Sequence, residues 1–396
     1  MFPKLRFKEF DGDLTESKLV ELTSWASGAT PAKDVPEYWG DGIPLISGAS
    51  MHTNQLYESD VKITKLGLQK GSKLALKDSI LILVRGSMLF NKIPMGITLG
   101  DVAFNQDVKC IRPKQQLAPL FLFQWLHAKE NTIQNKVTAT GIGAGKLDTA
   151  DLQNLKLYKP SLEEQTKIAT FLSAVDEKIS QLTQKHQLLR EYKQGMMQKL
   201  FSQQVRFKAD DKSEFGEWEE KELKDIAEIN PKSKKLPESF IYIDLESVEK
   251  GQLLLQKNIE LQDAPSRAQR LLAKGDVLFQ MVRPYQQNNY YFNLSGEYVA
   301  STGYAQIRTK LDSKFIYYAL HEKTFLDEVM NRCTGTSYPA INSSDLSSIE
   351  ILIPCLEEQT KIANFLSSID QKIEVVAQQI EQAKQWKKGL LQQMFI

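Results

Sequence analysis

The sequence has 396 residues, of which 42% are hydrophobic and 25% are charged, and its formal net charge is +1. This composition is ordinary for a folded chain of two or more domains and argues against a disordered one. No apolar run approaches the roughly 18–20 residues of a membrane span, and the start lacks the apolar core of a signal peptide. We therefore expect a cytoplasmic protein with no membrane contact.

The near-neutral charge and the cysteines also limit the possible functions. A chain that binds nucleic acid unaided is usually basic, so either its basic residues gather on one face or other subunits supply phosphate contacts. Cys110, Cys333 and Cys355 are scattered without CxxC spacing. We expect them to be small core residues, and neither a disulfide framework nor a zinc site is indicated.

Residues 1–159 are predicted to form a first domain that mixes helices with short strands. The apolar run at 81–84 predicts a buried strand, and the segment 121–131 predicts a short helix. The predicted strand leads into Arg85 and a polar loop. A second loop, with a Thr-Gly start at Thr140, comes shortly before the domain ends.

A first long helix is predicted over 160–202, opening with the phrase PSLEEQTKIATFLSAVDEKI. Pro160 marks the start and Ser161 is a suitable N-cap. Glu163 and Glu164 lie in the first turn, where carboxylates favour the positive helix end, so their role is predicted to be structural rather than catalytic. Positions with alternating spacings of four and three residues are mostly apolar, which predicts a coiled-coil seam. The seam positions are Ile168, Leu172, Val175, Ile179, Leu182, His186, Leu189, Lys193, Met196 and Leu200.

The second half of the chain repeats the first. Residues 203–353 are predicted to form a second mixed domain, with strands at 240–244, 277–282 and 349–354 and a short helix at 315–324. Residues 354–396 are predicted to form a second long helix, opening with PCLEEQTKIANFLSSIDQKI, 194 residues after the first copy. That period far exceeds the roughly 20–50 residues of solenoid units, so a duplicated domain-plus-helix unit is indicated.

Each seam needs a helical partner, and the other copy is the simplest candidate. Lys193 and Lys387 hold equivalent seam positions. In an antiparallel pair each lysine would lie toward the acidic start of the other helix, at 357–358 or 163–164, whereas a parallel pair would bring the two cations together. The antiparallel pair is therefore predicted. Lysines that simply extend out of the seam would explain the sequence equally well.

Two glycines hold matching positions inside the predicted helices, Gly195 and Gly389. Glycine inside a helix costs on the order of 1 kcal/mol relative to alanine. A close approach by another helix would explain their presence, and so would a bend.

The order of parts resembles a known family. Two dissimilar globular units, each followed by a P-x-L-E-E-Q-x-K-I-A-x-F-L-x-x-x-D-x-K-I helix, make the chain similar along essentially its whole length to the specificity subunit of type I restriction-modification enzymes. The resemblance implies an α+β fold, in which two mixed α/β target-recognition domains are separated by two long helices. These helices would pair as an antiparallel coiled coil with pseudo-two-fold symmetry.

The same resemblance implies a function and partners. Each domain would read one half of a bipartite target in double-stranded DNA, and the coiled coil would set the spacing between the halves and dock two methyltransferase (modification) subunits. Those subunits would hold S-adenosylmethionine and carry out DNA methylation, and restriction subunits would join the full complex.

The chain itself is predicted to be non-catalytic and to bind no cofactor or metal. An adenine methyltransferase needs an Asn/Asp-Pro-Pro-aromatic motif, whereas the nearest match, Asn230-Pro231-Lys232, lacks the second proline and the aromatic residue. The segment GIGAGK at 141–146 fails the P-loop spacing. Its counterpart at 335–340 reads GTSYPA, so the glycines are not a shared cofactor device.

Candidate DNA contacts lie on loops that differ between the two copies. Arginine can bond guanine, asparagine and glutamine can bond adenine, and lysine or tyrosine can reach phosphate. The Gln-Gln-Asn-Asn run at 286–289 is an apt base reader and equally an ordinary polar turn, while Arg85 and Arg283 recur in both copies, which favours a shared phosphate or structural role. The candidates are Ser47, Arg85, Ser87, Asn91, Lys92, Thr140, Lys146, Arg283, Tyr285, Gln286, Gln287, Asn288, Asn289, Thr334, Ser337 and Tyr338.

A coiled-coil assembly scaffold without direct DNA reading is the alternative function. Its globular ends would bind protein, and the near-neutral charge is its best argument. The two functions differ in salt dependence, because a nucleic-acid complex must weaken steeply as salt rises.

Overall fold

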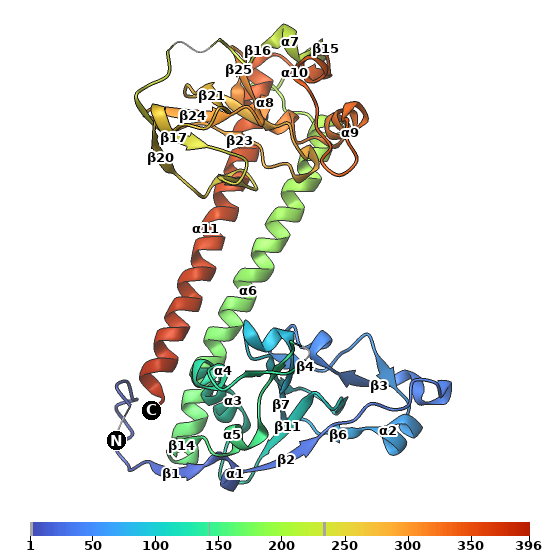
Figure 1. The fold of residues 1–396 in the computed structure, drawn as a ribbon, viewed down its shortest axis with the longest axis vertical. Helices are drawn as coiled ribbons and strands as arrows, with labels where there is room; N and C mark the ends of the chain where they lie inside the picture. Colours follow the sequence, from blue (N-terminus) through green and yellow to red (C-terminus); the bar gives the residue numbers. More distant parts are fainter. Residues whose placement is uncertain (1–2, 142, 233–234) are drawn as a thin grey trace. The chain divides into compact units, whose positions relative to one another are not determined.

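The computed structural model describes residues 3–141, 143–232 and 235–396 (Figure 1). The chain divides into two compact units. Unit 1 comprises residues 1–183 and 378–396, and unit 2 comprises residues 184–377. Both units combine β-sheets with short helices, as the mixed patterns of the sequence predict.

Two sheets form the centre of unit 1. Strand β7 (Ile80–Leu83) is buried at every position and has an antiparallel neighbour on each side. In the other sheet β3 (Trp39–Ile46) runs parallel to β10 (Val102–Phe104). The first sheet has the order β2 (Thr23–Ser27), β11 (Val108–Pro113), β7, β9 (Met95–Thr98), β4 (Gln55–Leu56), and the second has the order β5 (Lys62–Ile63), β3, β10, β6 (Lys73–Ala75).

Unit 2 repeats this topology. Strand β17 (Ser239–Ile243) runs parallel to β24 (Tyr298–Ser301), as β3 does to β10. The fully buried β22 (Val277–Gln280) takes the place of β7. The two sheets have the orders β16 (Ala227–Ile229), β25 (Tyr304–Thr309), β22, β23 (Tyr290–Tyr291) and β20 (Lys257–Glu260), β17, β24, β21 (Ala268–Leu271). The duplication predicted from the sequence is therefore present in the fold.

The short helices and the strands before the long helices also agree with the patterns. The helix predicted over 121–131 is α3 (Pro119–Ala128) followed by α4 (Glu130–Gln134), and the one predicted over 315–324 is α8 (Ser313–Ala319), with α9 (Lys323–Arg332) after it. β26 (Glu350–Ile353) matches the strand predicted at 349–354 and pairs with β15 (Glu219–Glu222). β14 (Lys156–Lys159) pairs in the same way with β1 (Thr15–Lys18).

The two long helices are α6 (Leu162–Phe201) and α11 (Leu356–Met394). Every predicted seam position of both helices is buried or partly buried, which confirms the seam. The seam positions of α11 are Ile362, Leu366, Ile369, Ile373, Val376, Ile380, Ala383, Lys387, Leu390 and Met394. Neither these helices nor any other helix in the described ranges is long and apolar enough to cross a membrane.

The antiparallel pairing is confirmed within each unit. In unit 1 the end of α11 lies beside the beginning of α6, and Lys387 Nζ is 2.6 Å from Asp176 Oδ1. In unit 2 the end of α6 lies beside the beginning of α11, and Lys193 Nζ is 2.6 Å from Asp370 Oδ1. The predicted partners of these lysines, the glutamates of the first turns, are wrong. The lysines pair with aspartates more than three turns further along.

The second glutamate of each first turn is already bound by an arginine of the same unit. Glu164 is almost fully buried and accepts two hydrogen bonds, each 2.7 Å, from the Arg6 guanidinium. Glu358 accepts the equivalent pair from Arg206, at 3.1 and 2.7 Å, and a third hydrogen bond from Trp218. These contacts confirm a structural role for Glu164 and Glu358, one residue of each acidic pair, and explain why LRFK at 5–8 recurs as VRFK at 205–208.

Each long helix ends against a phenylalanine of a short helix. In unit 2 Phe201 packs on Phe315 with ring centroids 5.6 Å apart, and the chain turns so that the Val205 amide donates to the Lys199 carbonyl oxygen. In unit 1 Phe395 packs on Phe121 at 5.4 Å, and the Leu5 amide donates to the Gln393 carbonyl oxygen. The two helix ends therefore share one junction geometry.

One cysteine prediction is wrong. Cys110 is buried, and burial raises the pKa of its thiol, while Cys333 is partly buried. Cys355 is exposed, because it replaces Ser161 in the turn that starts α11, where the side chain faces water. All three thiols are free.

Candidate nucleic-acid interface

In unit 1 the two loops that diverge between the copies meet at one end of β7. β8 (Arg85–Gly86) follows β7 and pairs with β13 (Gly145–Lys146), which pairs with β12 (Thr138–Ala139). A Cβ at Gly145 would lie 2.9 Å from the Gly86 carbonyl oxygen, so this close approach requires glycine. The loop after Arg85 and the loop after Thr140 thus form one surface; Ile142 of the glycine-rich segment lies outside the described residues.

Arg85 and Lys146 lie directly opposite each other across the β8–β13 ladder, and both side chains are exposed. Like charges at directly opposite positions destabilise a strand pair. No acidic side chain among the described residues forms an ion pair with either cation. Two uncompensated cations on adjacent strands fit an anionic ligand such as phosphate.

Three more candidates of unit 1 follow Arg85 in the same loop. Ser87 begins the turn η3 (Ser87–Phe90), and Asn91 and Lys92 follow it; all three side chains are exposed. The amides of Asn91 and Lys92 both donate to the Met88 carbonyl oxygen at 3.0 Å, which fixes the loop backbone and leaves the side chains free to face a ligand.

Thr140 and Ser47 serve the backbone in this structure. The Thr140 hydroxyl accepts a hydrogen bond from the Ala144 amide at 3.2 Å and closes the loop. The Ser47 amide donates to the Ser50 hydroxyl at 3.0 Å in the turn that leads into η2 (Gly48–Ser50). Gly48 lies against Leu83, the last residue of β7, so this turn lies at the same end of β7 as Arg85.

In unit 2 the equivalent loops also meet, but in a different conformation. Val282 and Thr334 both bridge to Ala340, and the Arg283 amide donates to the Pro339 carbonyl oxygen at 2.7 Å. Arg283 has a left-handed backbone with φ +55°, and the Arg283 guanidinium carbon lies 4.3 Å from the centre of the Tyr338 ring. The side chains of Tyr285, Thr334, Ser337 and Tyr338 are exposed around this contact.

The Gln-Gln-Asn-Asn run is bound mainly to its own unit. The Gln286 side chain accepts from Gln280, Gln287 donates to the His321 carbonyl oxygen, and Asn288 accepts from the Lys250 amide. Asn289 is buried, and its side chain accepts from the Gln280 amide at 2.8 Å. These amide groups hold the loop in place, and of the four residues only Gln286 is exposed.

Sequence reasoning missed the group that supports this loop. His321, two residues after the end of α8, is partly buried, and burial lowers its pKa to about 4. Its Nδ1 lies 2.7 Å from the Tyr317 carbonyl oxygen, and its Nε2 lies 3.4 Å from the Asn289 side chain. The recurrence of histidine at 127 and 321 was the available signal, but neither residue's contact with a loop follows from that spacing.

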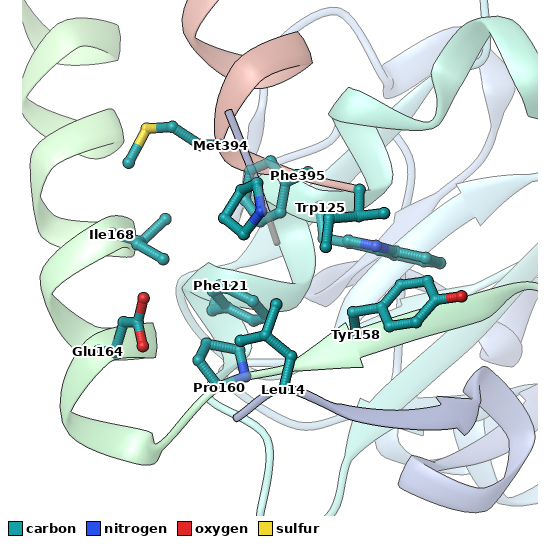
Figure 2. Close-up of a pocket in the computed structure, with 11 residues that line it drawn as sticks. Leu14, Phe121, Trp125, Tyr158, Pro160, Glu164, Ile168, Met394 and Phe395 are labelled. Atoms are coloured by element: carbon teal, nitrogen blue, oxygen red, sulfur yellow. The ribbon is translucent and has the colours of Figure 1, made fainter. Parts of the chain in front are cut away.

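The pocket of unit 1 shown in Figure 2 is part of the helix-end junction. Phe121 and Trp125 of α3 lie on one side and Glu164 and Ile168 of α6 on the other, with Phe395 above. Glu164, the charged side chain in its lining, is already bound by Arg6. No group of three or more His, Cys, Asp or Glu in the described ranges is placed to hold a metal ion.

The repeated α+β domains, each followed by one helix of an antiparallel coiled coil, define a class of protein built from two copies of one unit. The family model described as "Type I restriction modification DNA specificity domain" matches residues 12–190 and 216–385, one match for each copy. The chain belongs to this family.

Relatives and solved structures agree with that assignment. The chain is 27% identical over 97% of its length to the type I restriction enzyme MjaVIII specificity subunit of Methanocaldococcus jannaschii, of which 94% is covered. It is 28% identical over 98% of its length to the putative MjaX specificity subunit of the same organism, also with 94% covered. A crystal structure of the type I S subunit from M. genitalium has a similar fold, with a TM-score of 0.62, 17% identity, and 100% of this chain and 99% of that chain covered.

Proposed function

We propose that this chain is the DNA-recognition subunit of a type I restriction-modification complex. The observation that carries the proposal is the family match over both copies, together with the loops that diverge between copies at the same end of the central sheets. Its relatives are named specificity subunits, so catalysis would belong to other subunits and the chain would need no cofactor.

Each unit would read one half of a bipartite target in double-stranded DNA. Residues 1–159 and 203–353 would be the two target-recognition domains, and the helices over 160–202 and 354–396 would connect them. α6 has 40 residues and α11 has 39, and each contributes to both units. Helix length would therefore set the spacing between the half-sites.

Replacing residues 20–159 with the corresponding part of another family member is expected to change one half-site and leave the other half-site unchanged. The reason is that each loop pair that would contact DNA lies within a single unit. Sequencing the methylated positions in DNA from cells that carry the chimera and its partner subunits would measure this. The matched control is replacement of 220–353, which should change only the other half-site; a simultaneous change of both halves by one swap would contradict the proposal.

Salt dependence separates this function from the scaffold alternative. Binding of the chain with its modification subunits to duplex DNA should weaken steeply between low and moderate salt, with a slope set by the number of phosphates contacted. A scaffold that binds only protein would not bind duplex DNA and would therefore show no salt-dependent DNA binding.

Two equivalent surfaces on the coiled coil support the docking of two methyltransferase subunits. In unit 1 Trp386 is 54% exposed, its ring packs on the edge of Phe171 at 6.1 Å, and Phe171 packs on Phe7. In unit 2 Tyr192, at the equivalent position of α6, is 51% exposed, and Phe365 packs on Phe207. One residue set that occurs twice fits two copies of one partner.

The glycines next to these aromatics have open space around them. A Cβ at Gly195 or Gly389 would meet nothing within 4 Å, so the close approach considered from the sequence involves no described part of this chain. Each glycine lies three residues after an exposed aromatic residue. Because glycine has no side chain, a helix of a methyltransferase subunit could pack closely against the long helix at this point.

Gly195→Ala and Gly389→Ala are expected to stabilise the isolated chain, each by about 1 kcal/mol, because alanine favours the helix and meets no neighbour here. The same substitutions should weaken assembly with modification subunits. Denaturant unfolding and titration with the partner subunit would measure the two effects. Loss of stability, or unchanged assembly, would contradict the docking proposal; Ser173→Ala, elsewhere on α6, is the control.

A further inference from the structure

The two units present different chemistry at the arginine that they share in sequence. In unit 1 Arg85 lies in a regular β ladder beside Lys146. In unit 2 Arg283 lies in a left-handed turn with its guanidinium against the Tyr338 ring. The residue of unit 1 at the position of Tyr338 is Ala144, so unit 1 has no ring to hold its arginine.

The conformation of Arg283 is fixed from several sides. Its amide donates to Pro339, the following turn η5 (Pro284–Gln286) begins with proline, and the turn closes at Gln287, which is also left-handed with φ +51°. Non-glycine residues with such backbone angles cost of order 1–3 kcal/mol each and persist where the surroundings enforce them. Here the turn is fixed by a hydrogen bond from the Gln280 amide to the buried side chain of Asn289.

The guanidinium of Arg283 lies over the Tyr338 ring, with its central carbon 4.3 Å from the ring centre. Such a cation–π contact restricts the guanidinium, and stacking on the ring would leave its in-plane N–H groups free to meet a ligand. Tyr338 is 63% exposed, so this plane lies at the surface. No carboxylate within the described part of the chain forms an ion pair with Arg283, which leaves those donors available.

We propose that Arg283, held on the ring of Tyr338, reads a guanine in the half-site of unit 2 by donating two hydrogen bonds to O6 and N7 in the major groove. The inference deepens the proposed DNA-recognition function and rests on it. Arg85, with Lys146 opposite it, contacts phosphate instead, because two adjacent exposed cations suit an anionic backbone and have no aromatic ring to orient them for base reading. A strained, stacked arginine is preorganised and so loses little freedom on binding.

The test is selection of bound duplexes from a library with both half-sites randomised, using the full chain assembled with its modification subunits. Arg283→Lys keeps the charge and removes the planar fork. We expect discrimination at one G·C pair of one half-site to fall roughly tenfold to a hundredfold, while affinity for random duplex and its salt slope stay as in the wild type. Tyr338→Ala should reduce the same discrimination partially, and Tyr338→Phe should preserve it.

Arg85→Lys is the matched control and should leave both half-sites unchanged. The double variant Arg85→Ala/Lys146→Ala should lower the salt slope by about 2 and weaken all sequences alike. A uniform loss of affinity in Arg283→Lys would show a phosphate contact and overturn the inference, as would unchanged discrimination. If the wild-type complex selects no sequence at all, the proposed function itself fails and the inference fails with it, an outcome distinct from the other two.

Discussion

Glu358→Gln is expected to lower the free energy of unfolding by about 3–5 kcal/mol, because removing one partner of a buried ion pair leaves the other charge uncompensated. The Glu358 side chain is fully buried, and it accepts hydrogen bonds from Arg206 and from the Trp218 indole. Glutamine keeps the shape and loses the charge. Denaturant unfolding followed by circular dichroism and by tryptophan fluorescence would measure the change, since Trp218 reports on this site.

Glu357→Gln is the matched control for that experiment. Glu357 is the neighbouring residue, its side chain is about half exposed, and its ion pair with Lys361 spans 3.8 Å. Exposed pairs of this kind contribute roughly 0–1 kcal/mol, so the control should change stability little. If Glu358→Gln were as mild as the control, the arginine–glutamate pair would not be what holds the start of α11 to unit 2.

Lowering the pH from 7 to 4 is expected to cost unit 2 about 3 kcal/mol of stability through His321 alone. Burial lowers the pKa of His321 to about 4, against an ordinary value of 6.5. Above pH 6.5 the ring is neutral in both states, so the stability is fully present. As the pH falls toward 4, His321 takes up a proton in the unfolded chain but not in the folded chain. This proton uptake stabilises the unfolded state and so lowers the free energy of unfolding. The loss levels off below the folded pKa.

His321→Gln should be less stable than the wild type at pH 7, yet its stability should depend less on pH between 7 and 4. Chemical denaturation at a series of pH values would measure the slope. His127→Gln removes the imidazole at the equivalent position of unit 1 and serves as the control for the loss of a ring from a domain interior. An unchanged slope in His321→Gln would mean that the ring titrates in the folded state as it does in water.

Periodic features of this chain were predictable from the sequence, because periodicity reports local geometry. The seam of α6 and α11 and the buried strands β7 and β22 depend on residue spacing that burial enforces, and the duplication is visible in the repeated phrase itself. The repeated lysine favoured the antiparallel direction of the helix pair without deciding it, because lysines that extend out of the seam explain the sequence equally well. The carboxylate that each lysine binds was not predictable. Arg6 takes Glu164 and Lys387 takes Asp176, and this choice depends on which groups meet in space.

The candidate interface was less predictable for the same reason. The sequence singled out the loops after Arg85 and Arg283 and the Thr-Gly loops separately, since both differ between the copies; that the two loops of each unit meet is seen only in the structure. It gave no sign that the amides of 286–289 bond within the unit, or that Arg283 stacks on Tyr338 while Arg85 faces Lys146. Contacts between side chains that lie 50 residues or more apart in the sequence form only in the tertiary structure. A single sequence contains no periodic pattern that predicts them.

The junctions at the ends of α6 and α11 match, although only one of them is covalent. In unit 2 the chain continues from Phe201 through peptide bonds to Val205, whereas in unit 1 the end of α11 is joined to the start of the chain by a hydrogen bond from the Leu5 amide to the Gln393 carbonyl oxygen. Which of the two joints is covalent is therefore immaterial to the packing. A permuted polypeptide that starts at unit 2, with residues 396 and 3 bridged by a short linker, would satisfy every contact described above, and the order in which the halves are translated would be free to vary.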